Sequence, residues 1–183
     1  MTMFNYSLFM ILISLIGVSY ASILSEDDIV KLIGRPGKPL DVSYGEHSVV
    51  PGETLEISKT QNEPNIEIGE DDDCYRTLVM FDPDAPSATL PIMAQFRHWL
   101  VVNIKGSDMN SGDTKVTYMG PSPPKGTGPH RYIFAVYKQN DCKRTDFSNI
   151  NKARPKTSVA KLIADYNLNS SPESANVFFA EKK

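Results

Sequence analysis

Seven of the eleven residues from Gly120 to His130 are Pro or Gly, and this segment runs directly into the strand-like sequence of residues 131–137. Proline fixes the backbone φ angle, whereas glycine permits turns that other residues avoid. A segment of this composition forms a stiff, shaped loop rather than a helix or a strand. The sequence therefore predicts a loop that holds His130 in a defined place at the start of a buried strand.

Three apolar runs rich in valine, isoleucine and aromatic residues predict the central strands of a sheet. Both alternate faces of each run are apolar, which is typical of strands that are buried on both sides. These runs are residues 78–81, 96–104 and 132–137. Shorter strands are expected at residues 41–44, 54–57, 65–68, 115–118 and 176–180, and short amphipathic helices at residues 26–33 and 159–166. We therefore predict a mostly β, single-domain fold with short peripheral α-helices.

The first 21 residues contain no charged side chain and include a short apolar run followed by small residues up to Ala21. This pattern predicts a cleaved signal peptide at residues 1–21 and a secreted, extracellular domain at residues 22–183. An uncleaved membrane anchor is the alternative, although the apolar run is short for a membrane helix.

Charge limits the classes of partner. The net charge is -3 and Lys and Arg are not clustered, which argues against nucleic acid as a partner. The acidic run from Glu70 to Asp73 is interpreted as a solvated turn, because it lacks the ligand spacing of a calcium loop.

Cys74 and Cys142 are the two cysteines of the chain, and an even number is commonly paired in a secreted protein. If Asp82 at the end of one strand lies near His130 at the start of another, the two strands are antiparallel neighbours. Both cysteines then lie at the opposite end of this strand pair. We therefore predict a Cys74–Cys142 disulfide, with two free buried thiols as the alternative.

Asp82, His98 and His130 are polar residues that the predicted central strands carry among apolar neighbours. Because side chains alternate along a strand, His98 is expected to share a face with Phe96 and Leu100. A carboxylate and two imidazoles are costly to bury unless they bond one another or a ligand. These three groups are therefore expected to line one pocket.

Three kinds of chemistry fit this trio, and we favour the first. Histidines and backbone N–H groups of a glycine-containing loop can receive a phosphate or carboxylate group. The trio can also ligate a metal ion, but its spacing matches no compact metal motif. Acid–base hydrolysis is the third kind, but no Gly-x-Ser-x-Gly nucleophile motif occurs. The alternative to any site is that the histidines are satisfied core residues and the prolines only shape turns, with Ala85–Pro86 and Pro123–Pro124 as candidate cis bonds.

Three ordered motifs resemble those of the phosphatidylethanolamine-binding protein (Raf kinase inhibitor protein-like) family. They are DPDAPS at residues 82–87, HWLVVNI at residues 98–104 and PPKGTGPHRY at residues 123–132. The resemblance covers roughly residues 24–179 and is to the secreted invertebrate antigen-like branch. It implies a β-sheet fold with peripheral helices and a small anion-accepting pocket at one end.

The resemblance also implies a set of ligand-binding residues. They are Asp82, Pro86, Phe96, His98, Gly120, Pro123, Pro124, His130 and Tyr132. In this set Asp82 orients a histidine, the two histidines contact the phosphate, and Tyr132 adds a hydroxyl donor. Pro121 and Ser122 stand where the family often has Ser-Gly, which removes one approach of a backbone N–H to the phosphate.

The sequence thus predicts a secreted, non-enzymatic binding protein for phosphatidylethanolamine head groups or related small phosphate-bearing ligands, without a cofactor or a metal ion. The alternative is a protein-interaction modulator such as a serine protease inhibitor, with a protease or a signalling protein as partner. Peripheral contact with a membrane is compatible with a lipid ligand. Asn169 lies in an Asn-x-Ser glycosylation sequence on an expected loop, followed directly by Pro172.

Overall fold

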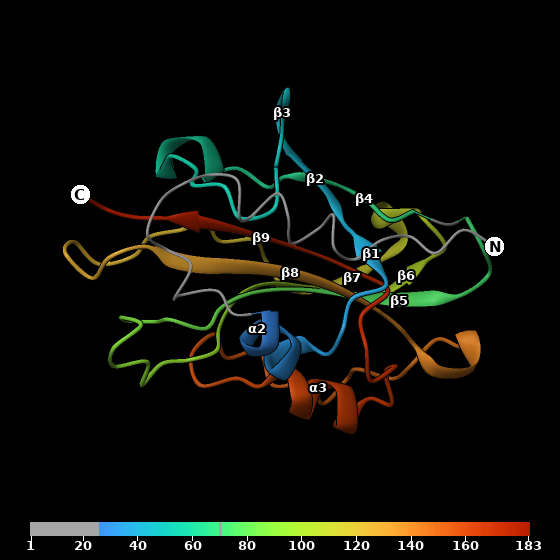
Figure 1. Ribbon diagram of the computed structural model, residues 1–183. Coiled ribbons are helices and arrows are strands. Elements are labelled where there is room, and N and C mark those ends of the chain that lie inside the picture. Colours follow the sequence, from blue (N-terminus) through green and yellow to red (C-terminus); the bar gives the residue numbers. More distant parts are fainter. Residues whose placement is uncertain (1–25, 70) are drawn as a thin grey trace.

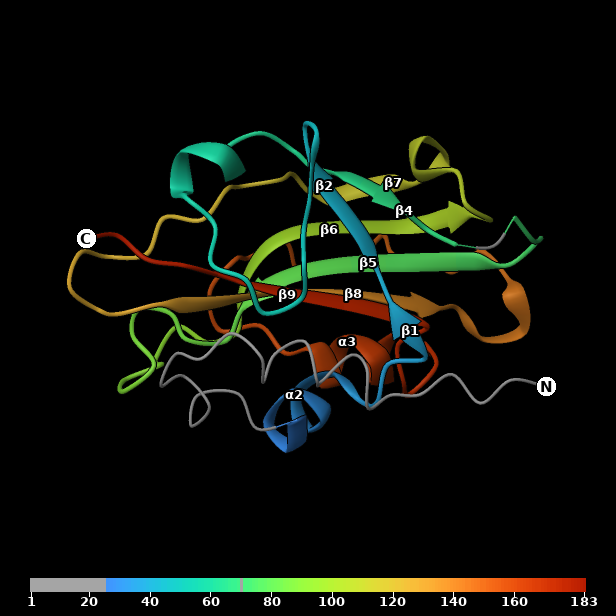
Figure 2. The ribbon, with the colours of Figure 1, turned by 45° about the horizontal axis from the view of Figure 1, so that its top comes forward.

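The computed structural model describes residues 26–69 and 71–183, so the predicted signal peptide lies outside the described residues. A six-stranded sheet runs through the molecule in the order β1-β9-β8-β5-β6-β7 (Figures 1 and 2). β1 pairs with β9 in parallel, and the other neighbouring strands of this sheet are antiparallel. This architecture confirms the predicted mostly β fold with short peripheral helices.

Both faces of the central sheet are buried, which explains the continuous apolar runs of its strands. The strands are β1 Lys38–Pro39, β5 Tyr75–Asp82, β6 Phe96–Lys105, β7 Asp113–Val116, β8 His130–Lys138 and β9 Ser174–Ala180. On one face, Val79 and Leu100 pack in a core with the helices α2 (Glu26–Ile33) and α3 (Val159–Asp165). On the other face, Met80 and Phe134 pack in a second core.

A smaller, three-stranded sheet covers the second core (Figure 1). It consists of β3 (His47–Ser48), β2 (Asp41–Tyr44) and β4 (Asn65–Glu67), with β2 in the middle. Single turns of 3-10 helix lie at η1 (Ile57–Thr60), η2 (Met109–Ser111) and η3 (Asn140–Cys142). No helix in residues 26–69 and 71–183 is long and apolar enough to cross a membrane.

Two expected strands differ from the structure. The segment 54–57 makes only an isolated bridge from Thr54 to Phe179, and η1 begins at Ile57. The segment therefore contacts β9 at one residue, Phe179, and the chain then forms the 3-10 turn η1. The strand expected at residues 115–118 is β7, which begins and ends two residues earlier because its partners are Leu100 to Val102 of β6.

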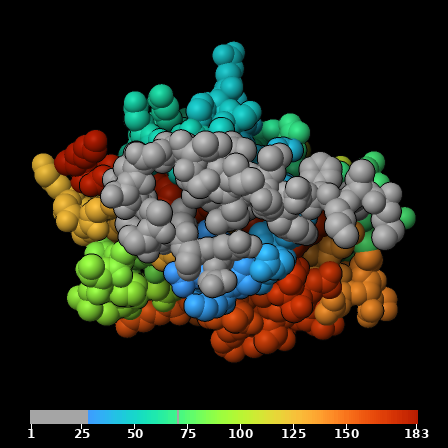
Figure 3. Space-filling view, viewed as in Figure 1, coloured from blue at the N-terminus to red at the C-terminus, as the bar shows by residue number. Residues whose placement is uncertain are grey.

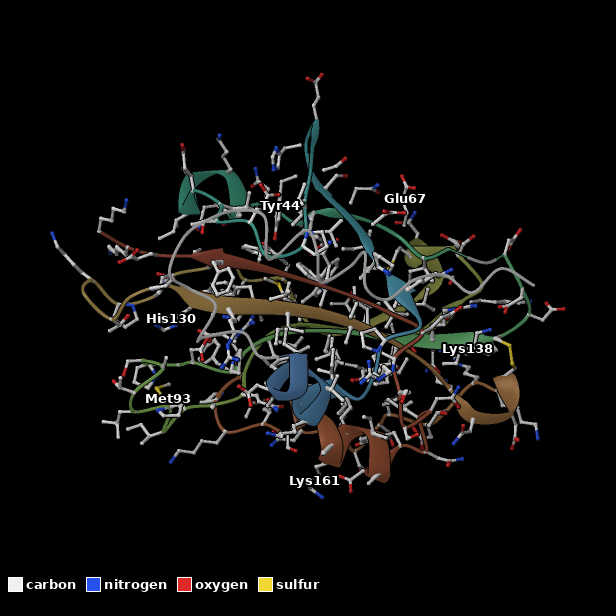
Figure 4. The ribbon with its side chains drawn as sticks, viewed as in Figure 1. Tyr44, Glu67, Met93, His130, Lys138 and Lys161 are labelled. Atoms are coloured by element: carbon white, nitrogen blue, oxygen red, sulfur yellow. A yellow bond between two sulfur atoms is a disulfide. The ribbon has the colours of Figure 1, made fainter. Side chains whose placement is uncertain are left out.

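The predicted Cys74–Cys142 disulfide is confirmed and joins the two chain segments at the end of the sheet far from His130 (Figure 4). Beside it, the fully buried Arg76 guanidinium donates to the Asp72 and Glu173 carboxylates at 2.7 Å each. The Arg76 guanidinium holds the pKa of the Asp72 carboxyl well below its usual range. In the acidic run, Asp71 and Asp73 are exposed, as expected for a solvated turn, whereas Asp72 is half-buried and also belongs to this ion cluster.

Candidate functional site

Asp82 and His130 form a buried pair at one end of the central sheet. Asp82 is the last residue of β5 and His130 is the first residue of β8, so antiparallel pairing brings them side by side. His130 Nδ1 lies 2.8 Å from the Asp82 carboxylate, and neither side chain is more than 5% exposed. The other Asp82 oxygen accepts the backbone N–H of Asp84 at 2.6 Å. The structure thus brings two of the predicted site residues together and fixes both.

Thr127, which the sequence analysis did not single out, completes the surroundings of His130. Its Oγ1 lies 2.9 Å from His130 Nε2 and donates its proton to the Pro124 carbonyl at 2.8 Å. Nδ1 faces the Asp82 carboxylate, so both ring nitrogens of His130 have a protein hydrogen-bond partner. These two contacts fix the position and the plane of the ring.

The same contacts bear on the two other chemistries. Because both ring nitrogens of His130 have protein partners, the ring has no free nitrogen for a metal ion. Across the described part of the chain, no three His, Cys, Asp or Glu side chains are grouped as metal ligands. Thr127 Oγ1 donates to the Pro124 carbonyl, whereas a nucleophile needs a base that receives its proton. The geometry suits a hydrogen-bonding role for His130.

His98 occupies a β-bulge in β6. Its neighbours Arg97 and Trp99 each pair with a residue of β5, whereas His98 between them has no partner there. A bulge adds one residue and so reverses the alternation of faces beyond it. Leu100 consequently packs in the core with the helices, whereas the His98 ring contacts Tyr132 at 5.1 Å on the opposite face. The prediction that Leu100 shares a face with His98 is therefore wrong, because it assumed an unbroken ladder.

His98 is a neutral ring with one nitrogen left as a hydrogen-bond acceptor. Its Nδ1 donates to the Met119 carbonyl at 2.6 Å. Burial lowers the pKa of His98 from its ordinary value of 6.5, so the ring is neutral at pH 7. The neutral tautomer with its proton on Nδ1 keeps a lone pair on Nε2. His98 and His130 therefore present complementary groups, one accepting and one donating.

A row of aromatic rings forms the apolar wall of the site. Phe96 lies against His98 at 5.1 Å between ring centroids, and Tyr132 stacks on Phe178 of β9 at 5.3 Å. Phe178 was missed because it belongs to an ordinary apolar strand that carries no motif. The backbone N–H of Ser122 bonds the Tyr132 hydroxyl oxygen, and burial raises the pKa of that hydroxyl, so its proton is retained for donation.

Gly120 packs the site loop closely against η1. A Cβ atom at this position would lie 2.6 Å from the Thr60 carbonyl oxygen. That oxygen accepts the Tyr118 hydroxyl at 2.7 Å, and the Gln61 side chain donates to the Pro121 carbonyl at 3.1 Å. Because Gly120 has no side chain, the backbone at the start of the site loop can lie directly against the backbone of η1. This close contact positions the start of the loop.

The three predicted prolines have different roles. Pro86 follows a cis peptide bond, as predicted, and is half-buried. Pro123 is buried and Pro124 is exposed, and the bond between them is trans, which contradicts the second cis candidate. The turn after Pro124 is closed instead by its carbonyl, which accepts both the side chain and the backbone N–H of Thr127. Trans is the ordinary state of an X–Pro bond, and this turn does not require the other isomer.

Comparisons with known proteins show the family of the chain. A family model described as phosphatidylethanolamine-binding protein matches residues 36–179, which include all three motifs. Carboxypeptidase Y inhibitor of Saccharomyces cerevisiae is 32% identical over 203 residues, which cover 86% of this chain and 90% of that protein. Putative odorant-binding protein A5 of Drosophila melanogaster is 33% identical over 132 residues, 69% of this chain and 62% of that protein.

A solved structure gives the same result for the fold. The crystal structure of carboxypeptidase Y inhibitor complexed with its cognate proteinase has a TM-score of 0.74 to this chain at 31% identity. The match covers 93% of this chain and 99% of the inhibitor chain. The relatives named here are thus an inhibitor and an odorant-binding protein.

Proposed function

The chain belongs to the phosphatidylethanolamine-binding protein family, and we propose that it is a non-enzymatic binding protein for phosphatidylethanolamine head groups or related small phosphate-bearing ligands. The ligand lies against Asp82, His98, His130 and Tyr132. The observation that carries this proposal is the buried His130 ring, which Asp82 and Thr127 hold through both ring nitrogens. An imidazole fixed in this way can donate a hydrogen bond to an anion.

The donor and acceptor groups match a zwitterionic headgroup. A phosphate oxygen replaces Thr127 as the acceptor of the His130 Nε2 proton, and the Tyr132 hydroxyl donates a second bond. The neutral His98 Nε2 accepts a proton from the ammonium group or from a protonated phosphate oxygen. His98 therefore selects for a ligand that carries a donor beside its anion.

A binding role fits these residues better than hydrolysis. Hydrolysis through a covalent intermediate requires a nucleophile whose proton is held by a base. The nearest hydroxyl to His130 belongs to Thr127, and its proton goes to the Pro124 carbonyl. Both nitrogens of His130 already have protein hydrogen-bond partners.

Calorimetry with soluble phosphoethanolamine tests the proposal. We expect binding by the unmodified chain and at least tenfold weaker binding by His130→Ala, since a charge-assisted hydrogen bond of roughly 1.5–3 kcal/mol is lost. His47→Ala is the matched control, because this third histidine is exposed and its side-chain partner among the described residues is Glu53. Equal affinity in the His130 and His47 variants would reject the site.

Inhibition of a proteinase is a second candidate function. It is favoured by the 32% identity to carboxypeptidase Y inhibitor over most of both chains. Inhibition through a surface loop predicts that His98→Ala/His130→Ala still inhibits, whereas inhibition through the headgroup site predicts that it does not. A titration of carboxypeptidase activity with the unmodified chain and this variant separates the two. No inhibition by the unmodified chain would dismiss this candidate.

Secretion is part of the proposal. The Cys74–Cys142 disulfide supports an oxidising compartment, because cytosolic thiols are kept reduced. Asn169 is exposed in the loop between α3 and β9, where a glycan could be attached. Mass spectrometry of the secreted protein should show loss of residues 1–21 and a glycan on Asn169. A full-length product retained in the cell would contradict secretion.

A further inference from the structure

The loop between β5 and β6, residues 83–95, presents apolar side chains to solvent at the His130 end of the sheet. Leu90 and Ile92 are 58% and 61% exposed and flank Pro91. Figure 4 places Met93 of the same loop at the same end of the molecule as His130, and Figure 3 shows this loop in light green at the end where the gold β7–β8 loop also projects. Exposed apolar side chains gathered at one loop tip mark a surface that meets a partner.

Basic residues lie on two further segments at this end of the molecule. Lys125 lies in the β7–β8 loop, and Lys152 and Lys156 lie in the segment 151–157, which the Lys156 N–H joins to the Met93 carbonyl at 3.1 Å. In the described structure, none of these three lysines forms an ion pair with a carboxylate, and all are exposed. The tip therefore lies among free positive charges.

Acidic residues do not cancel these charges within the three loops. Asp84 is the acidic residue of segments 83–95, 117–129 and 151–157, and it is buried in a bidentate pair with Arg131 at 2.6 and 2.9 Å. The chain as a whole has a net charge of -3, so positive charge is concentrated here against the overall balance. We call Leu90, Ile92, Lys125, Lys152 and Lys156 the basic apolar end.

We propose that the basic apolar end docks on the surface of an anionic phospholipid bilayer. Leu90 and Ile92 enter the headgroup layer, while the lysines, which lie on separate loops, contact anionic headgroups spread over a plane. This arrangement fits an extended anionic sheet, because the apolar tip and the charges share one end of the molecule. This proposal deepens the proposed function. It rests on the proposed function at one point, namely that docking brings His130 close to the lipid headgroup that it binds.

Vesicle sedimentation of the secreted form tests the docking. We expect the protein to sediment with vesicles of phosphatidylcholine and phosphatidylserine, and not with vesicles of phosphatidylcholine alone. Charge reversal in Lys152→Glu/Lys156→Glu should weaken the binding roughly tenfold or more. The matched control is Lys105→Glu/Lys143→Glu at the disulfide end, which should bind like the unmodified chain. Equal loss in both variants, or binding unaffected by either, would overturn the proposal.

The apolar contribution has its own variant and control. Leu90→Ser/Ile92→Ser should reduce vesicle binding at raised salt, where the lysines are screened. Val50→Ser removes another exposed apolar side chain outside the loops of the basic apolar end and should have no effect. Sedimentation of Leu90→Ser/Ile92→Ser equal to that of Val50→Ser would contradict insertion of the tip.

Failure of the docking is distinguishable from failure of headgroup binding. Leu90→Ser/Ile92→Ser should retain calorimetric affinity for phosphoethanolamine, whereas His130→Ala should lose that affinity and still sediment with anionic vesicles. If the unmodified chain binds phosphoethanolamine but sediments with neither kind of vesicle, the docking proposal is overturned and headgroup binding is not. An acidic protein surface would then be the partner of this end.

Discussion

Thr127 Oγ1 lies 2.9 Å from His130 Nε2 and is the hydrogen-bond partner of the nitrogen that a bound phosphate group would contact. Asp82 holds the other nitrogen from β5, so the ring is fixed from two sides before a ligand arrives. The free protein thus satisfies both nitrogens of a buried imidazole internally, and ligand binding exchanges one hydrogen-bond partner for another. Preorganisation of this kind lowers the cost of binding.

Thr127→Val should destabilise the free protein by about 1–3 kcal/mol, because it removes the acceptor of the buried Nε2 proton while preserving shape. Thr127→Ser keeps the hydroxyl and serves as the control. Denaturant unfolding measures both. Added phosphoethanolamine should reduce the difference in unfolding free energy between the two variants, because its phosphate bonds His130 Nε2 in Thr127→Val. Equal stability of the two variants without ligand would show that the hydrogen bond has no structural role.

His98 should make the protein less stable in mild acid. Burial lowers its pKa from 6.5, so below pH 6.5 the unfolded chain binds a proton more readily than the folded chain. The stability gained from neutral His98 is complete above pH 6.5 and is lost as the pH falls toward the folded pKa.

Unfolding free energies measured from pH 7 down to about pH 5 check this expectation. His98→Asn, whose amide can still donate to Met119, should show a smaller loss of stability over this window. His47→Asn should lose as much as the unmodified chain. A His98 variant with an unchanged pH dependence would contradict the assignment of a neutral, buried ring.

Gly120→Ala should destabilise the protein by roughly 1–3 kcal/mol, because its Cβ would meet the backbone oxygen of Thr60 at 2.6 Å. Gly69→Ala is the control, since its new Cβ meets only the flexible end of the Lys38 side chain. Thermal unfolding compares the two. If both variants melt at the same temperature, close packing of the site loop on η1 is not required.

The ion pair between Asp72 and Arg76 should contribute to how the free energy of unfolding depends on pH in acid. Arg76 lowers the pKa of Asp72 from 3.8, so the stabilisation is present above pH 3.8 and is lost as the pH falls below that value. Asp72→Asn should be less stable at neutral pH and show a flatter decline in acid. Asp73→Asn, whose exposed carboxylate is 3.4 Å from Lys105, should follow the unmodified chain. Parallel curves for all three proteins would exclude the role of the ion cluster.

Much of the fold could be predicted because its central strands obey local rules. The runs that became β5, β6 and β8 are apolar on both faces, and the pairing of Asp82 with His130 follows from antiparallel strands. The same reasoning placed Cys74 and Cys142 together. These inferences needed only alternation and the order of the strands.

The remaining features depend on contacts between distant segments. The bulge at His98 is a property of how β6 pairs with β5, so alternation within β6 alone assigned Leu100 to the wrong face. Thr127 could have been noticed from its place between Gly126 and Gly128, which both have a φ of 78° and bend the loop back toward His130. Phe178 carries no such signal, because an aromatic residue in a terminal strand is ordinary.

The most direct test of headgroup binding is a crystal structure of the chain with phosphoethanolamine. We predict that a phosphate oxygen accepts the His130 Nε2 proton in place of Thr127, with the Asp82 contact preserved and His98 Nε2 facing a donor of the ligand. A ligand held elsewhere, with the hydrogen bond between Thr127 and His130 intact, would contradict the account.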